Sequence, residues 1–192
     1  MSIKVDNSFL VPAQLEDAWA ILIDVPKVAP CIPGAEITEV IDACTYKGLA
    51  RVKIGPVQLV FNGEAKLHDV DPAAHTSRLS ARGGDTKGRG SVQSEMRFAL
   101  APEADQTRVS VMTDITLAGT VAQYGRGVGM IRAVCNQLTA EFARNLAAQI
   151  EGRGDSAPGE PAKPVSAIGV VSSAVKALVG KRRDEEKGQG QG

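Results

Sequence analysis

Histidine and cysteine, which commonly catalyse reactions or bind metals, are few and scattered in this chain of 192 residues. There are two histidines, His68 and His75, and three cysteines, Cys31, Cys44 and Cys135, without a CxxC pair. An odd number of widely spaced cysteines is atypical of a disulfide framework or a Cys-rich zinc site. We therefore expect no metal site. Neither histidine is predicted to point inward, as a nucleophile–histidine pair would require.

Carboxylates in the segments of alternating polarity lie on the polar side of the predicted strands. Glu64, Glu95 and Asp114 lie in segments of alternating polarity, opposite the apolar residues. Acid–base catalysis needs a titratable group inside the site. The pattern offers no inward carboxylate, so it predicts no catalytic residue. Polar residues expected to point inward are Asn7, Ser94, Thr113 and Tyr124.

Two glycine-rich stretches resemble nucleotide-binding loops only superficially. GGDTKGRG (83–90) lacks the GK[ST] of a P-loop and lies between two alternating segments, so it is interpreted as a hairpin turn. Gly125, Gly127 and Gly129 form GxGxG rather than GxGxxG. Each glycine inside a helix costs about 1 kcal/mol relative to alanine. This stretch is therefore either a site of close packing or a weak segment that gates a cavity mouth.

The elements that must position these residues follow two periods. Residues 3–11 alternate in polarity, a helical stretch begins at Pro12, and 25–34 is predicted to be a short helix or turn. From 35 to 117 a period of two, broken by turn signals, predicts about six further strands. Residues 121–146 switch to the spacing of one helix of about thirty residues. The pattern predicts an α+β fold: a curved antiparallel sheet of about seven strands around a long C-terminal helix, with two short helices after strand 1.

A curved sheet that grips a helix tends to leave a cavity between the two layers. The cavity walls are predicted from inward strand residues and from the apolar stripe of the helix: Leu59, Phe61, Met96, Phe98, Val111, Ile115, Tyr124, Val128 and Ile131. The mouth is predicted where the short helices meet the glycine-weakened helix start, at Trp19, Cys31, Pro33, Gly34 and Gly125.

Composition changes once, near residue 151, and all seven aromatic residues precede that point. Residues 1–150 are predicted to form one α+β domain, and 151–164 a flexible Gly/Pro linker. A short apolar amphipathic segment follows at 165–180, and a charged disordered end at 181–192.

The apolar segment of the tail is too short to span a bilayer. As a helix it would reach about 22 Å, against roughly 30 Å for the hydrocarbon core. We expect it to associate reversibly with a membrane surface, with docking onto the domain or onto a protein partner as the open alternatives. The residues predicted to make this contact are Ile168, Val171, Val175, Leu178, Lys181, Arg182 and Arg183.

The charge balance and the N-terminal residues argue against nucleic-acid-binding and secreted proteins. The 22 basic and 22 acidic side chains balance, which argues against nucleic-acid binding. The N-terminal residues lack the apolar core of a signal peptide, so we expect a cytoplasmic protein. Basic residues outnumber acids on the predicted outer sheet face. That face is interpreted as solvated, with docking of an acidic protein as the alternative.

The order of elements and four stretches of sequence identify a family. They are VPAQLEDAWAILIDVPKVAPCIPGAE (11–36), YKGLARVKIGPVQLVFNGEAKL (46–67), GRGSVQSEMRFAL (88–100) and DITLAGTVAQYGRGVGMIRAVCNQLTAEFARNL (114–146). Over residues 1–150 the chain resembles the CoxG family of carbon monoxide dehydrogenase proteins, within the START-like, polyketide-cyclase-like (SRPBCC) helix-grip superfamily. The CIPGAE segment is the most specific part of this resemblance.

The resemblance implies a non-catalytic accessory protein of a molybdenum-containing CO dehydrogenase or related hydroxylase. It implies a cavity that binds a quinone or other apolar lipid, without a covalent cofactor, and a link to the inner face of the cytoplasmic membrane. Two alternatives stay open. One is a recruitment or assembly adaptor without a ligand, and the other is a small cyclase- or hydrolase-type enzyme.

Overall fold

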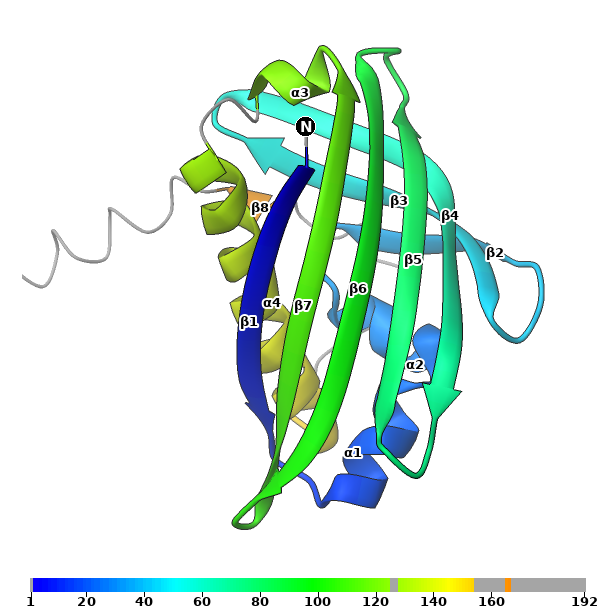
Figure 1. The fold of residues 1–192 in the computed structure, drawn as a ribbon, viewed down its shortest axis with the longest axis vertical. Coiled ribbons are helices and arrows are strands. Elements are labelled where there is room, and N and C mark those ends of the chain that lie inside the picture. Colours follow the sequence, from blue (N-terminus) through cyan, green and yellow to red (C-terminus); the bar gives the residue numbers. More distant parts are fainter. Residues whose placement is uncertain (1, 125–127, 154–164, 167–192) are drawn as a thin grey trace, which may run out of the picture.

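The protein is seen in a computed structural model that describes residues 2–124, 128–153 and 165–166, without the side chains of Tyr124, Val128, Val165 and Ser166 (Figure 1). In chain order the elements are β1 (Ser2–Val11), α1 (Leu15–Leu22), α2 (Val25–Val28), the 3-10 helix η1 (Ala29–Cys31), β2 (Ala35–Val40), β3 (Thr45–Ile54), β4 (Val57–Asp71), β5 (Thr76–Asp85), β6 (Gly90–Glu103), β7 (Gln106–Gly119), α3 (Val121–Tyr124), α4 (Val128–Ile150) and β8 (Val165–Ser166).

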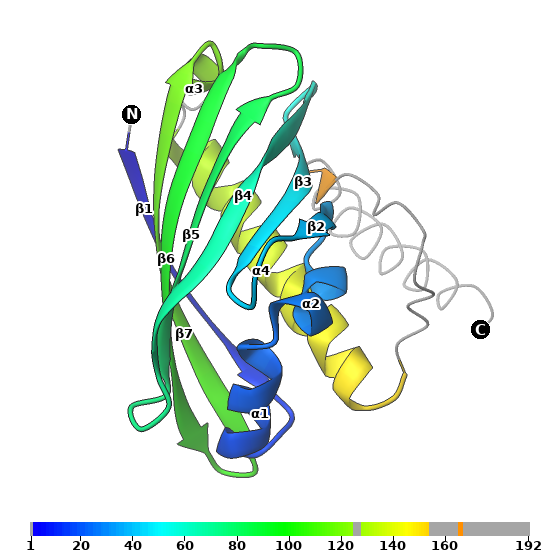
Figure 2. The same cartoon turned by 90° about the vertical axis from the view of Figure 1, so that its right-hand side faces the viewer.

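Seven strands form one curved antiparallel sheet in the order β1-β7-β6-β5-β4-β3-β2. Helix α4 lies along its concave face, and α1 and α2 pack on the same side (Figure 2). No helix covers the opposite, convex face in the described part of the chain. The predicted α+β helix-grip architecture is confirmed.

Alternation along each strand sets which residues face α4. In β4 Leu59, Phe61 and Leu67 are buried, whereas Asn62 and Lys66 between them are exposed. Antiparallel pairing carries this parity from strand to strand, because residues directly opposite each other share a face. The inward sets of β6 and β7 follow as predicted, with Leu100 and Leu117 buried at opposite ends.

The core consists of two apolar clusters. The Trp19 cluster joins α1, the α2–η1 corner and the C-terminal end of α4, and comprises Val11, Ala18, Trp19, Leu22, Val28, Cys31, Leu100, Val109, Val111 and Leu146. The Leu59 cluster joins strand residues to α3 and the N-terminal part of α4, and comprises Ile3, Val5, Ile54, Leu59, Phe61, Leu117, Val121 and Ile131. Helix α4 spans both, because Ile131 lies in one and Leu146 in the other.

The prediction of one continuous helix from residue 121 is wrong. Helix α3 lies at the end of the sheet and α4 runs in another direction (Figure 1). Val121 is fully buried in the Leu59 cluster, and its N–H donates to the carbonyl of Arg89 at 3.0 Å. The division falls where the sequence carries Gly125, Gly127 and Gly129, and glycine weakens a helix interior.

The start of the predicted apolar tail is a strand. Val165 and Ser166 pair in parallel with Val52 and Lys53 of β3. This pairing is possible because β2 reaches only to Ala35, opposite Ala50, and leaves the next residues of that edge open. The predicted contact residues of the tail, Ile168, Val171, Val175, Leu178, Lys181, Arg182 and Arg183, lie outside the described residues, as does most of the predicted linker.

Removing residues 154–192 should expose this edge of β3. Backbone groups of Val52 and Lys53 that face β8 would then bond water, so hydrogen exchange of a peptide covering residues 51–54 should accelerate. Mass-spectrometric exchange on the full and truncated chains measures this. A peptide covering residues 97–101 of β6, between two other strands, is the control. Equal exchange at 51–54 in both chains would contradict the pairing.

Candidate functional site

A band of small residues separates the two apolar clusters on the concave face. Three of its members, Gly48, Gly63 and Gly83, lie directly opposite one another on β3, β4 and β5. The adjacent row runs through Ala65, Ala81 and Ser94. With Ala50, the whole band is Gly48, Ala50, Gly63, Ala65, Ala81, Gly83 and Ser94.

A cavity of about 190 Å³ lies at this band and is partly open to solvent. Its lining is mainly apolar. Besides the band, the α2–β2 segment contributes Val25, Ala29, Ile32 and Ile37, and the strands contribute Phe61, Leu79 and Val92. Charged lining residues come from the outward register or the sheet edge and mark its margin: Glu36, Lys47, Glu64 and Arg82.

Two glycines of the band, Gly48 and Gly63, are required by close approach of neighbouring backbones. A Cβ on Gly63 would lie 2.0 Å from the carbonyl oxygen of Arg82, and one on Gly48 would lie 2.3 Å from that of Glu36. No side chain fits at such distances without movement of the strands. At Gly48 and Gly63 the cavity wall is therefore bare backbone, whereas a Cβ on Gly83 would lie 3.2 Å from the carbonyl oxygen of Asn62.

The predicted wall residues lie mostly in the filled core, with Phe61 alone among them lining this cavity within the described part of the chain. Leu59, Ile115 and Ile131 belong to or pack on the Leu59 cluster, and Met96, Phe98 and Val111 belong to or pack on the Trp19 cluster. The side chains of Tyr124 and Val128 lie outside the described residues. The sequence pattern favoured large inward residues, whereas the cavity forms where inward residues are small.

Trp19, predicted at the mouth, is buried inside its cluster. Its indole contacts the ring of His75 edge-on, with centroids 5.5 Å apart, and lies 6.3 Å from that of Phe98. His75 also forms an ion pair or hydrogen bond with Glu16 at 3.1 Å, in the turn after β4. These contacts fix α1 against the end of the sheet, away from the cavity lining.

The CIPGAE segment, also predicted at the mouth, anchors the corner between η1 and β2. The Cys31 thiol donates to Oε1 of Gln149 at 2.8 Å, and Nδ2 of Asn145 donates to the carbonyl of Cys31 at 3.0 Å. Burial raises the pKa of the Cys31 thiol. This corner is thereby tied to the end of α4.

The same segment is tied to β3 through its glycine. Gly34 has φ +78°, a Cβ there would lie 2.2 Å from the carbonyl oxygen of Arg51, and its own carbonyl accepts from the Arg51 N–H at 2.8 Å. Pro33 is half-buried beside it, and Gly125 lies outside the described residues. The cavity is lined by residues adjacent to those predicted, Ala29, Ile32 and Ala35.

One carboxylate does point inward, contrary to the prediction. Asp85 pairs opposite Phe61 at the end of β5, and its side chain has no exposed area. Its carboxylate accepts from Nε and Nη2 of Arg89, both at 2.8 Å, and from the N–H of Lys87 at 3.0 Å. Side-chain hydrogen bonds from Arg89 are the main cause that holds the pKa of Asp85 far below its usual range.

This network organises the predicted hairpin turn at 83–90. Nη2 of Arg89 also donates to the carbonyl of Gln58 at 2.9 Å, and the N–H of Val60 donates to Asp85. The turn is thus bound to β4 by its own charged pair. A carboxylate held ionised by so many donors is a weak base, so Asp85 anchors the loop and lacks the properties of a proton acceptor.

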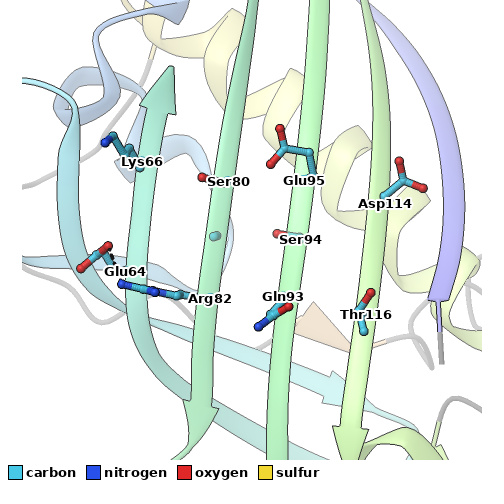
Figure 3. Close-up of a pocket in the computed structure, with 10 residues that line it drawn as sticks. Glu64, Lys66, Ser80, Arg82, Gln93, Ser94, Glu95, Asp114 and Thr116 are labelled. Atoms are coloured by element: carbon cyan, nitrogen blue, oxygen red, sulfur yellow. Dashed lines mark hydrogen bonds and ion pairs between the residues drawn. The ribbon is translucent and has the colours of Figure 1, made fainter. Parts of the chain in front are cut away.

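The convex face carries a polar groove of about 550 Å³ (Figure 3). Its lining comes from β4 to β7: Glu64, Lys66, Ser80, Ala81, Arg82, Gln93, Ser94, Glu95, Asp114 and Thr116. Most arginines of this face have acidic partners across strands. Arg82 pairs with Glu64 at 3.3 Å, and Arg51 with Glu36 at 2.9 Å.

Within the described part of the chain, no group of three or more His, Cys, Asp or Glu side chains is arranged to hold a metal ion. No helix formed by the described residues has the length and apolar character needed to cross a bilayer.

Comparison with known proteins identifies one family and one fold. The family model described as the carbon monoxide dehydrogenase G subunit (CoxG) matches residues 8–151. No curated protein matches the chain by sequence.

Three solved structures share the fold. A conserved protein from Geobacillus kaustophilus is 22% identical, with a TM-score of 0.68 over 79% of this chain and 96% of that one. The Zhui aromatase/cyclase from Streptomyces is 17% identical, with a TM-score of 0.54 over 83% and 100% of the two chains. Norcoclaurine synthase from Thalictrum flavum is 13% identical, with a TM-score of 0.54 over 81% and 90%.

Asp85→Asn should lower the melting temperature at pH 7 by several degrees, because it leaves the Arg89 guanidinium without its buried counter-charge. A carboxyl with a depressed folded pKa stabilises the fold above its unfolded pKa of about 3.9, and this contribution is lost as pH falls through the folded value. The difference in melting temperature between wild type and variant should therefore become smaller as the pH falls from about 5 to about 2. Calorimetric melting curves measure it.

Asp105→Asn, at an exposed position in the β6–β7 turn, is the matched control and should change the melting temperature little. A gap between wild type and Asp85→Asn that stays constant over the whole pH range would contradict the assigned role of the Asp85 charge.

Proposed function

Because the chain belongs to the CoxG family of carbon monoxide dehydrogenase proteins, we propose that it is an accessory protein that carries a quinone for a molybdenum-containing CO dehydrogenase or related hydroxylase. The matched residues 8–151 span nearly the whole domain, from the end of β1 to the end of α4. Membership of this family supports association with CO dehydrogenase. The ligand, the membrane contact and the absence of catalysis are our proposals.

The apolar cavity is the observation that carries the ligand proposal. Its volume of about 190 Å³ is below the roughly 300–1,000 Å³ of sites that enclose drug-sized ligands. It suits a flat ring system, with the rest of a larger lipid at the open side. Burying about 200 Å² of ring surface would contribute about 5 kcal/mol. Association costs of several kcal/mol reduce this, so binding should be reversible, as a carrier requires.

Ser94 supplies a polar contact for such a ring. It lines the cavity in the row of Ala65 and Ala81, and its hydroxyl has no hydrogen-bond partner among the described residues. A hydroxyl can donate to a carbonyl oxygen, which a quinone offers. The other cavity hydroxyl, that of Tyr46, already donates to the carbonyl of Ala43 at 2.6 Å. Ser94 is thus the group that would orient the ligand.

We propose that the chain does not catalyse a reaction. Asp85 is held ionised by Arg89, and His75 is engaged with Glu16 and Trp19 outside the cavity. The solved structures of similar fold include a cyclase and a synthase, so a small enzyme is the competing hypothesis. Their identity below 25% relates them to this chain by fold alone. Turnover of an offered substrate by the purified chain would overturn our proposal.

The tail is proposed to contact the inner face of the cytoplasmic membrane. Its apolar residues from Ile168 to Leu178 are followed by Lys181, Arg182 and Arg183, which would attract anionic lipid. An adaptor without a ligand would need only this tail and a surface for the oxidoreductase. The cavity experiments separate the two hypotheses.

Enlarging Ala81 should abolish ligand binding with the fold intact. Ala81→Leu places three additional carbons in existing space, so the melting temperature should change little, whereas the quinone extracted with the protein from its native host should disappear. Mass spectrometry of the organic extract and titration of the purified chain with a soluble quinone measure this. Ala118→Leu, exposed on β7, is the control of equal size change.

A wild-type chain that is fully folded, carries no lipid from its host and binds no offered quinone would contradict the carrier proposal. The adaptor hypothesis would then replace it. Equal binding by wild type and Ala81→Leu would instead locate the ligand away from this cavity.

Ser94→Ala should weaken quinone binding about two- to tenfold, the loss expected for one hydrogen bond of about 0.5–1.5 kcal/mol. Binding of a hydrocarbon of similar shape without carbonyl groups should not change. Ser110→Ala, exposed on β7, is the control. Equal losses for the quinone and the hydrocarbon would show that Ser94 acts through shape rather than by donating a hydrogen bond.

A further inference from the structure

The convex face contains two pairs of like charges directly opposite each other on neighbouring strands. Arg78 of β5 pairs with Arg97 of β6, and Glu95 of β6 pairs with Asp114 of β7. Like charges in directly opposite positions destabilise a sheet. The isolated domain therefore carries two unfavourable pairs on adjacent rows of one face.

Neighbouring charges compensate these pairs only in part. Asp114 has Lys4 at 3.8 Å, but that side chain is 80% exposed, and such pairs contribute little. Glu95 has only His68, with Nε2 at 3.5 Å, within the described residues. Arg78 contacts Asp69 at 3.2 Å, whereas Arg97 forms no ion pair in the same part of the chain.

The two carboxylates are oriented apart. In Figure 3, that of Glu95 turns toward β5 and that of Asp114 toward β1. Nearer the other end of the same groove, Arg82 and Glu64 form an opposite-charge pair across strands at 3.3 Å. The face is thus able to pair opposite charges, and the two like pairs stand out from this arrangement.

The acidic and basic pairs lie close enough for one partner surface. Glu95 and Arg97 are two residues apart on β6, a rise of about 7 Å, and point to the same side. Ser80, Gln93 and Thr116 in the adjoining groove offer hydrogen-bonding groups. A protein surface with a basic side chain beside an acidic one would complement both pairs and remove both repulsions.

We propose that this convex face is the docking surface for the oxidoreductase, which presents such a basic–acidic pair. This inference rests on the proposed function, since it assigns the surface through which the accessory protein meets its enzyme. No helix formed by the described residues covers the face (Figure 2). Helices α2 and η1, which line the cavity from the other side, pack on the concave face, whereas Glu64, Ala81, Arg82 and Ser94 line both the cavity and the groove.

Charge reversal of either pair should weaken docking. We expect Arg97→Glu and Asp114→Lys each to reduce binding of the full chain to purified CO dehydrogenase of the same host about tenfold, mainly through slower association. The wild-type affinity should fall with added salt. Arg132→Glu on α4 and Asp17→Lys on α1 make the same charge changes at exposed positions on the other layer, and should bind as wild type does.

A second measurement separates docking from a merely solvated face. Arg97→Gln removes one repulsive partner, so the free chain should melt at a higher temperature while its binding to the enzyme weakens. A lower melting temperature for this variant would overturn the argument from like-charge pairs.

Binding outcomes distinguish this inference from its premise. A wild-type chain that fails to bind the enzyme overturns both the accessory function and the docking face. A wild-type chain that binds, with both reversal variants equal to the controls, overturns the docking face alone.

Discussion

Close approach of the backbones at Gly48 and Gly63 is the constraint on which the rest of the domain depends. At Gly48 and Gly63 the carbonyl of a neighbouring strand occupies the space where a side chain would begin. The row that they form with Gly83 carries no side chain, and it crosses β3, β4 and β5 between two apolar clusters. Each cluster secures α4 at one end, and the space left between them is the cavity. A hollow in this fold thus follows from strand geometry rather than from a missing side chain.

Two further contacts hold the ends of this arrangement. The Asp85–Arg89 pair binds the β5–β6 turn to β4 beside the Leu59 cluster. The corner at Cys31 and Gly34 binds η1 to α4 and to β3 beside the Trp19 cluster. In both, a buried polar side chain, Asp85 or Cys31, is hydrogen-bonded within the protein, so these contacts specify geometry. Asp85, Arg89 and Cys31 therefore serve the structure of the domain.

The fold was predictable from the sequence, because alternation along single strands fixes which side chains face inward. The cavity was less predictable from the sequence. Its lining depends on which residues of different strands share a row, and one strand taken alone does not show that Gly63 lies opposite Gly83. Asp85 was missed because glycines at 83 and 84 interrupt the alternation before it. The single-helix prediction failed because the 3–4 spacing of apolar residues continues from α3 into α4, and spacing alone does not show where one helix ends and the next begins.

The same register bears on our proposal that one sheet serves two ligands. Positions along β4, β5 and β6 alternate between the two faces of the sheet, so Ala81 and Arg82, or Ser94 and Glu95, are neighbours in the chain on opposite registers. The two hollows are nevertheless adjacent, because Glu64, Ala81, Arg82 and Ser94 line both. Balanced net charge fits this division, because a face that recognises a basic–acidic pair needs both signs. A surface with one strong sign of charge would attract many partners. A pair of arginines beside a pair of carboxylates instead favours a partner that docks in one orientation.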